Sequence, residues 1–147
     1  MHKVLVVGCG GSGAKTLAYM MDQLKTTLAE RLPERYDSPK DVELPRAWQF
    51  VSVDVPTVAE RPGKNLANVP EAGGRYISCG SSDRYATVDT AVSNQLASRR
   101  ELGTIASWAL DNPAAETTPI SAGAGQYRSI GRMLFLSKLQ ELSLIHI

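Results

Sequence analysis

A glycine-rich turn near the start of the chain combines residue types and spacing that suit phosphate chemistry. The segment Gly8–Gly13 reads Gly-Cys-Gly-Gly-Ser-Gly and satisfies the pattern GxGxxG. Glycines adopt positive φ, and the N–H groups that open a following helix attract anions. The turn predicts a phosphate cradle, although a tight turn without a ligand would have the same pattern. The candidate ligand-binding residues are Gly8, Cys9, Gly10, Gly11, Ser12 and Gly13.

A strand and a helix must hold this turn in place. Residues 3–7 form a continuous apolar run, which predicts a parallel strand buried on both faces. After Gly13 the period changes to that of an amphipathic helix, which Pro33 ends. The apolar stripe of this helix consists of Leu17, Met21, Leu24, Leu28 and Leu32.

Further elements alternate along the chain. Residues 48–55 predict a second strand, which Pro56 stops, and residues 75–79 predict a short third strand, with polar loops over 34–46 and 61–75. Helices are predicted over 84–98 and 102–110, and a second glycine turn, 120–126, leads into a helix at Ile130. This order predicts the α/β class, a Rossmann-like parallel sheet with flanking helices.

Composition excludes several classes of protein. The 147 residues carry 16 basic and 15 acidic side chains, a net charge of +1, which argues against nucleic acid as a partner. No apolar run is long enough to span a bilayer. Cys9 and Cys79 suggest neither a disulfide framework nor a zinc site, so a cytoplasmic location is expected. With only His2 and His146 present, most histidine-dependent catalysis is excluded.

Three simpler interpretations of the first turn fit less well. A dinucleotide-binding domain places an acid about 20 residues beyond its glycines, whereas Asp54 lies 41 residues after Gly13. A Walker A loop needs Gly-Lys directly, and here Ala14 separates Gly13 from Lys15. A nucleophile elbow at Ser12 lacks its last glycine and a histidine base. The dinucleotide interpretation, an NAD- or FAD-binding oxidoreductase domain, stays open.

Three segments together resemble the nucleotide-binding loops of the tubulin/FtsZ superfamily, and most closely those of its bacterial tubulin-like proteins. The first is the turn at residues 6–13. The second is Val53–Val58, Val-Asp-Val-Pro-Thr-Val, similar to the acidic loop of tubulin. The third is Gly123–Arg132, in which Gly-Ala-Gly-Gln leads to Gly-Arg. The segments follow the same order as in the family.

The resemblance implies a function and a set of site residues. It implies a GTP-binding protein that self-associates into filaments and completes GTP hydrolysis in trans, with the phosphates also held by Gly123, Ala124, Gly125 and Gln126. Asp54 would lie near an accompanying Mg²⁺ ion or cap a turn. Arg128 and Arg132 would face phosphate or, more simply, solvent. No catalytic residue and no protein metal ligand are assigned in this chain.

The chain also departs from the family. Val55 stands where tubulin has a second carboxylate before Pro56, which weakens the case for magnesium coordination by this loop. The Gly-Gly-Gly-Thr-Gly-Thr-Gly loop of the family is absent, and residues 84–110 look like a helical insertion. Residues 143–147 resemble translated adapter sequence. We therefore expect residues 1–142 to be an amino-terminal fragment that is inactive alone. A degenerate interaction module without a nucleotide is a further alternative.

Overall fold

The chain forms two compact units, which are described separately. The computed structural model describes residues 2–97, 109–117, 119–124 and 127–138. Unit 1 contains residues 2–54 and 58–77, and unit 2 contains the described residues among 55–57 and 78–138.

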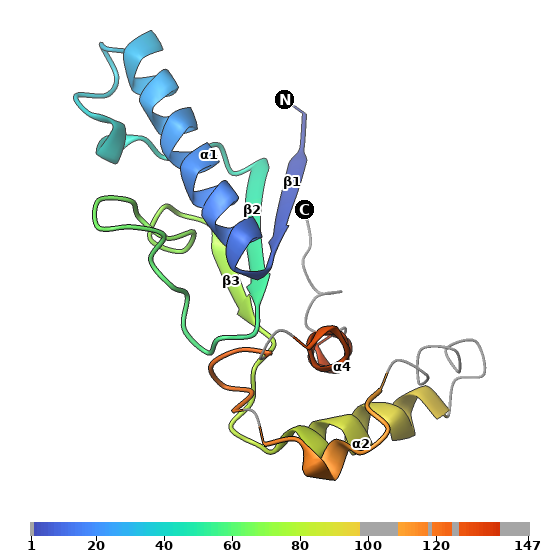
Figure 1. The fold of residues 1–147 in the computed structure, drawn as a ribbon. Coiled ribbons are helices and arrows are strands. Elements are labelled where there is room, and N and C mark those ends of the chain that lie inside the picture. Colours follow the sequence, from blue (N-terminus) through green and yellow to red (C-terminus); the bar gives the residue numbers. More distant parts are fainter. Residues whose placement is uncertain (1, 98–108, 118, 125–126, 139–147) are drawn as a thin grey trace. The chain divides into compact units, whose positions relative to one another are not determined.

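Unit 1 is a parallel sheet with one long helix. Its strands are β1 (Val4–Cys9), β2 (Trp48–Asp54) and β3 (Arg75–Ser78), in the order β1-β2-β3. Ser78, the last residue of β3, is the first of its segment to belong to unit 2. Strands β1 and β2 pair in parallel from Val4 opposite Trp48 to Cys9 opposite Val53. The helix α1 (Gly10–Arg31) follows β1 without a linker and lies along the sheet (Figure 1). The predicted order of strand, glycine turn, helix and strand is confirmed.

The apolar stripe of α1 builds the core of unit 1. Leu17, Ala18 and Met21 are buried together with Phe50 of β2 and with Val69 and Ala72 of the segment before β3. The helix ends at Arg31 because Pro33 follows two residues later and disfavours further helical backbone. The next loop contains one turn of 3₁₀ helix, η1 (Pro39–Asp41), which packs against α1.

The burial of β1 differs from the prediction. Val4, Leu5 and Val7 are 40%, 37% and 47% exposed, so β1 is not buried on both faces. In the described part of the sheet β1 is an edge strand that pairs with β2 alone. Strand β2 lies between two neighbours, and all four of its residues 50–53 are buried. The continuous apolar pattern therefore predicted burial correctly for the central strand and wrongly for the edge strand.

The segment between β2 and β3 has no helix, as its prolines and glycines predict. Gly73 has φ of +102°, a conformation that other residues rarely adopt. A Cβ on Gly74 would lie 2.6 Å from the Val69 Cγ1 atom and 2.8 Å from the Phe50 carbonyl oxygen. These two glycines let the chain turn tightly against the core just before β3.

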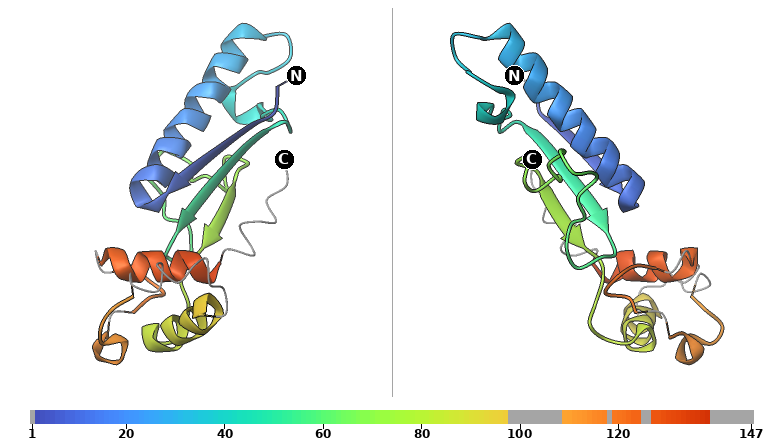
Figure 2. Two further views of the ribbon diagram at one scale, coloured as in Figure 1. Left: turned by 90° about the vertical axis from the view of Figure 1, so that its right-hand side faces the viewer. Right: turned by 60° about the vertical axis from the view of Figure 1, so that its left-hand side comes forward.

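Unit 2 is built on two helices, α2 (Tyr85–Ala97) and α4 (Arg128–Ser137), which pack against each other. A 3₁₀ turn, η3 (Pro113–Ala115), contacts α2 (Figure 2). The buried side chains of this unit include Tyr85, Val92, Ile120, Ile130, Met133 and Leu134. Most of the helix predicted over 102–110 lies outside the described residues. None of the helices in the described part of the chain is long and apolar enough to cross a membrane.

Candidate functional site

The glycine turn joins β1 to α1 through direct backbone packing. A Cβ on Gly8 would lie 2.5 Å from the Gly13 carbonyl oxygen and 2.9 Å from the Leu17 side chain. A Cβ on Gly13 would lie 2.7 Å from the Gly8 carbonyl carbon. These two glycines therefore have a structural role, because they let the end of β1 pack directly against the first turn of α1.

The residues between them form the open part of the turn. Gly10 has φ of +71°, and a Cβ there would meet no atom within 4 Å. Gly11 and Ser12 are exposed, and Cys9, the N-cap residue, makes no side-chain hydrogen bond to the helix. There is also no acidic residue in the first turn. The first N–H groups of a 22-residue helix thus lie where an anion could accept hydrogen bonds from them.

Asp54, the last residue of β2, lies beside this helix end. A Cβ on Gly11 would be 3.8 Å from the Asp54 Oδ2 atom. Parallel pairing places the carboxyl ends of β1 and β2 at the same sheet edge, and this explains why Gly11 and Asp54, 43 positions apart, are neighbours. The structure therefore brings the predicted residues of the first loop and Asp54 together within unit 1.

A cavity of about 250 Å³ in unit 1 borders the same residues. Gly11, Ala14 and Lys15 of α1 line it on one side, and Asp54 of β2 and Arg61 line it elsewhere. Lys15 is one residue too far from Gly13 for a Walker A lysine and is not among the site residues predicted from the sequence. Its spacing of four residues from Gly11 places both on one helix face, a signal that could have found it.

The wall of this cavity around Arg61 is held by polar contacts. Arg61 donates two hydrogen bonds to Glu71 Oε1, from Nε at 3.1 Å and from Nη2 at 2.6 Å. The Asn68 N–H donates to Glu71 Oε2 at 3.1 Å, and the Glu71 N–H donates to Asn68 Oδ1 at 3.0 Å. The hydrogen bond from Arg61 lowers the pKa of Glu71, and the bond from the Asn68 backbone lowers it further.

The two remaining predicted loops meet inside unit 2. The Thr57 N–H donates to the Ser121 carbonyl oxygen at 3.0 Å, so the Pro-Thr part of the second loop lies beside the start of the third. Gly80 fits between them, because a Cβ there would collide with the carbonyl oxygens of Val55 and Ile120. Residues 120–122 form a turn that leads toward Gly123.

The third predicted loop is described in part. Gly123 and Ala124 are half-buried, and a Cβ on Gly123 would meet no atom within 4 Å. Gly125 and Gln126 lie outside the described residues. Tyr127 is the N-cap of α4 without a side-chain hydrogen bond, and Arg128 and Arg132 on that helix are exposed. The predicted contribution of Gly123–Gln126 to the site of unit 1 stays a prediction.

The two cysteines differ in their burial. Cys9 is exposed in the turn, and Cys79 is buried. In the described ranges, no group of three or more His, Cys, Asp or Glu residues could hold a metal ion. Asp54, the acidic residue among the predicted site residues, lies beside the glycine turn in unit 1.

A parallel sheet, a glycine turn and an uncapped helix end define an α/β protein of the Rossmann-like type. The tubulin-like family model matches residues 5–144, so the chain belongs to the tubulin-like family. No curated protein and no solved structure matches the chain. The family assignment agrees with the resemblance of the three loop segments.

Proposed function

We propose that the chain binds GTP through the turn between β1 and α1. The observation that carries this proposal is the open end of α1, where Gly10, Gly11 and Ser12 leave the first amides of the helix accessible in a tubulin-like chain. The residues fit a phosphate group, since an anion there would meet amide donors and the positive end of the helix dipole. A side chain at Gly11 would stand in its way.

Asp54 suits a role beside the phosphates. Mg²⁺ in nucleotide sites is bound by one or two carboxylates together with phosphate oxygens and water. Asp54 offers one carboxylate next to Gly11, and in the proposal it holds a water of the Mg²⁺ shell. Gly123–Gln126 supply further amide donors to the terminal phosphates, a role that rests on the likeness to the family.

The wider activity is proposed on family grounds. In a longer protein that carries this chain, GTP binding supports self-association into filaments in the cytoplasm, and a neighbouring subunit completes hydrolysis. This chain contributes the nucleotide-receiving part, with no catalytic residue of its own. Alone, it binds GTP weakly and does not hydrolyse it.

One observation favours a second candidate, a dinucleotide-binding domain. Asp54 ends β2 beside the glycine turn, and this is where such domains carry the acid that accepts hydrogen bonds from the ribose. Base-reading residues would decide between the two candidates.

Calorimetry with GTP, ATP and NAD tests the proposal on this chain and on any longer reading frame that contains it. GTP binding that exceeds ATP and NAD binding supports the proposal. NAD binding without GTP binding supports the dinucleotide-binding domain, and no binding of any of the three supports a degenerate module. Robust GTP turnover by the isolated chain would contradict the idea that hydrolysis is completed in trans.

A further inference from the structure

A second and larger cavity in unit 1 lies away from the glycine turn. It has a volume of about 590 Å³ and is bordered by α1, by residues 40–50 and by residues 71–75. Trp48 and Arg75, the first residues of β2 and β3, both line it. It therefore lies at the amino ends of the strands. Asp54 is six residues further along β2, about 20 Å away at the usual rise of a strand.

Four cations from four separate segments surround this groove. They are Lys25 of α1, Lys40 of η1, Arg46 before β2, and Arg75 of β3. The ion pair found among the described residues, Arg61 with Glu71, includes none of them. Within the described residues, the side chains of these four cations also donate no hydrogen bond.

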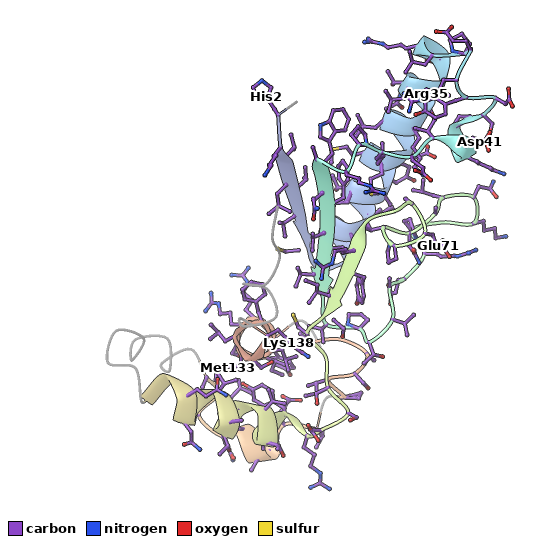
Figure 3. The ribbon with its side chains drawn as sticks, turned by 180° about the vertical axis from the view of Figure 1, so that it is seen from behind. His2, Arg35, Asp41, Glu71, Met133 and Lys138 are labelled. Atoms are coloured by element: carbon purple, nitrogen blue, oxygen red, sulfur yellow. The ribbon has the colours of Figure 1, made fainter. Side chains whose placement is uncertain are left out.

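The acidic residues of the groove balance little of this charge. Glu43 and Glu71 line it, and Glu71 is labelled in Figure 3. Glu71 already accepts hydrogen bonds from Arg61 and from the Asn68 backbone. Glu43 lines the groove with the four cations, and among the described residues it forms no ion pair. The whole chain has a net charge of only +1, so this groove concentrates positive charge that the rest of the surface balances.

Most of the remaining lining, apart from Gln49, is apolar and points to the class of ligand. Val42 and Phe50 are buried beneath the groove, and Leu44, Pro45 and Trp48 are half-buried along it. The phosphates of a nucleic acid or a polyphosphate would use the cations but leave Leu44 and Pro45 without an apolar partner. A peptide that carries both carboxylates and aliphatic side chains matches both parts of the lining.

We propose that this groove binds an acidic peptide segment of a partner protein, with carboxylates paired to Lys25, Lys40, Arg46 and Arg75 and an aliphatic side chain over Leu44 and Trp48. The site is separate from the glycine turn and does not depend on the proposed nucleotide function.

Fluorescence anisotropy of a labelled peptide of alternating glutamate and leucine tests this proposal on the full chain. We expect saturable binding that weakens as salt is added. Lys25→Gln and Arg75→Gln should each weaken binding about fivefold, and the double variant about twentyfold, as for exposed charge pairs. Lys64→Gln is the matched control, since Lys64 is exposed and lies outside the groove lining. Unchanged thermal unfolding verifies that each variant is folded.

Three further probes make the test decisive. A peptide of alternating lysine and leucine should not bind, and one of alternating glutamate and serine should bind more weakly than the leucine peptide. Inorganic triphosphate should compete poorly. Absence of binding, equal effects of Lys64→Gln and Arg75→Gln, or complete displacement by triphosphate would each overturn the proposal, the last in favour of a simple phosphate site.

Discussion

The backbone of Gly8, the penultimate residue of β1, lies against the backbone of Gly13 in the first turn of α1. A Cβ on Gly8 would come within 2.5 Å of the Gly13 carbonyl oxygen. The two outer glycines of the motif thus have a packing role, and the inner ones leave the helix end open. This division separates residues whose replacement should unfold unit 1 from residues whose replacement should affect ligand binding alone.

Replacing Gly8 or Gly13 by alanine should destabilise the fold. The added methyl group collides with backbone atoms that cannot rotate away, and we expect a loss of about 3 kcal/mol, the upper range for an overpacked site. Urea unfolding measures the loss. Gly63→Ala is the matched control, because a Cβ there meets nothing within 4 Å, and it should change stability by less than about 1 kcal/mol. Equal effects at Gly8 and Gly63 would refute the packing role.

Gly11→Ala should preserve the fold and weaken GTP binding. The new Cβ would lie 3.8 Å from the Asp54 Oδ2 atom, an ordinary contact, and we expect it to hinder a phosphate that approaches the first amides of α1. Loss of one charge-assisted hydrogen bond predicts about tenfold weaker binding. Calorimetry gives the affinity and urea unfolding verifies the fold. An unchanged affinity for GTP would place the phosphates elsewhere.

Asp54→Asn should remove the effect of magnesium on GTP binding. An amide is a poorer partner than a carboxylate for the ion and its waters. We expect Mg²⁺ to strengthen GTP binding by the original chain about tenfold and to leave the variant nearly unaffected. Titration of GTP with and without Mg²⁺ measures both ratios. A variant that keeps the full Mg²⁺ effect would show that Asp54 has a structural role.

The hydrogen bonds between Arg61 and Glu71 should weaken in acid. The hydrogen bond from Arg61, and then that from the Asn68 backbone, lower the pKa of Glu71 below its ordinary value of 4.5. The contribution of this carboxylate to stability is therefore complete above that value and is lost as the pH falls through the lowered pKa. NMR of the Arg61 Nε–H and Asn68 N–H signals follows the change. In Glu71→Gln these signals should no longer shift over this range.

Unit 2 should lose stability in alkali through Tyr85. Its side chain is buried and its hydroxyl donates to Asp89 Oδ2 at 2.7 Å. Burial, and then this hydrogen bond, raise the pKa of Tyr85 above its ordinary value of 10.0. The contribution of the protonated Tyr85 hydroxyl to the stability of unit 2 is complete below pH 10.0 and declines as the pH rises toward the raised pKa.

Tyr85→Phe tests this contribution directly. The variant should lose about 1–2 kcal/mol at neutral pH, because Asp89 stays buried and keeps, among the described residues, one long contact to the Ser93 hydroxyl, at 3.5 Å. It should also lose the alkaline part of the pH dependence. Chemical denaturation at several pH values provides both results, and a variant that is as stable as the original would refute the account.

Much of the fold could be predicted because local signals agree with one another. The apolar stripe from Leu17 to Leu28 and the stop at Pro33 defined α1, and the run after Trp48 defined β2. Burial of β1 could not be predicted, because an apolar run has the same pattern in a central strand and in an edge strand. Only the pairing order distinguishes Val7, which is exposed, from Val51, which is buried.

The candidate site was predictable where residues are close in sequence or end parallel strands. The turn at Gly8–Gly13 and the approach of Asp54 to Gly11 follow from these rules. The ion pair of Arg61 and Glu71 could not be predicted, because it depends on the path of an irregular loop. The groove around Lys25 and Arg75 joins charges from distant segments that no sequence spacing connects.

Strand β1 also has a practical consequence for work with the chain. Its six residues, Val4–Cys9, include no charged side chain and no proline, the features with which natural proteins usually protect a strand edge. Among the described residues its outer edge offers unpaired amides and carbonyls next to exposed aliphatic side chains. Such an edge is a template for adding another strand, and its aggregation tendency should grow with protein concentration. We therefore expect this strand to limit the solubility of the chain at high concentration.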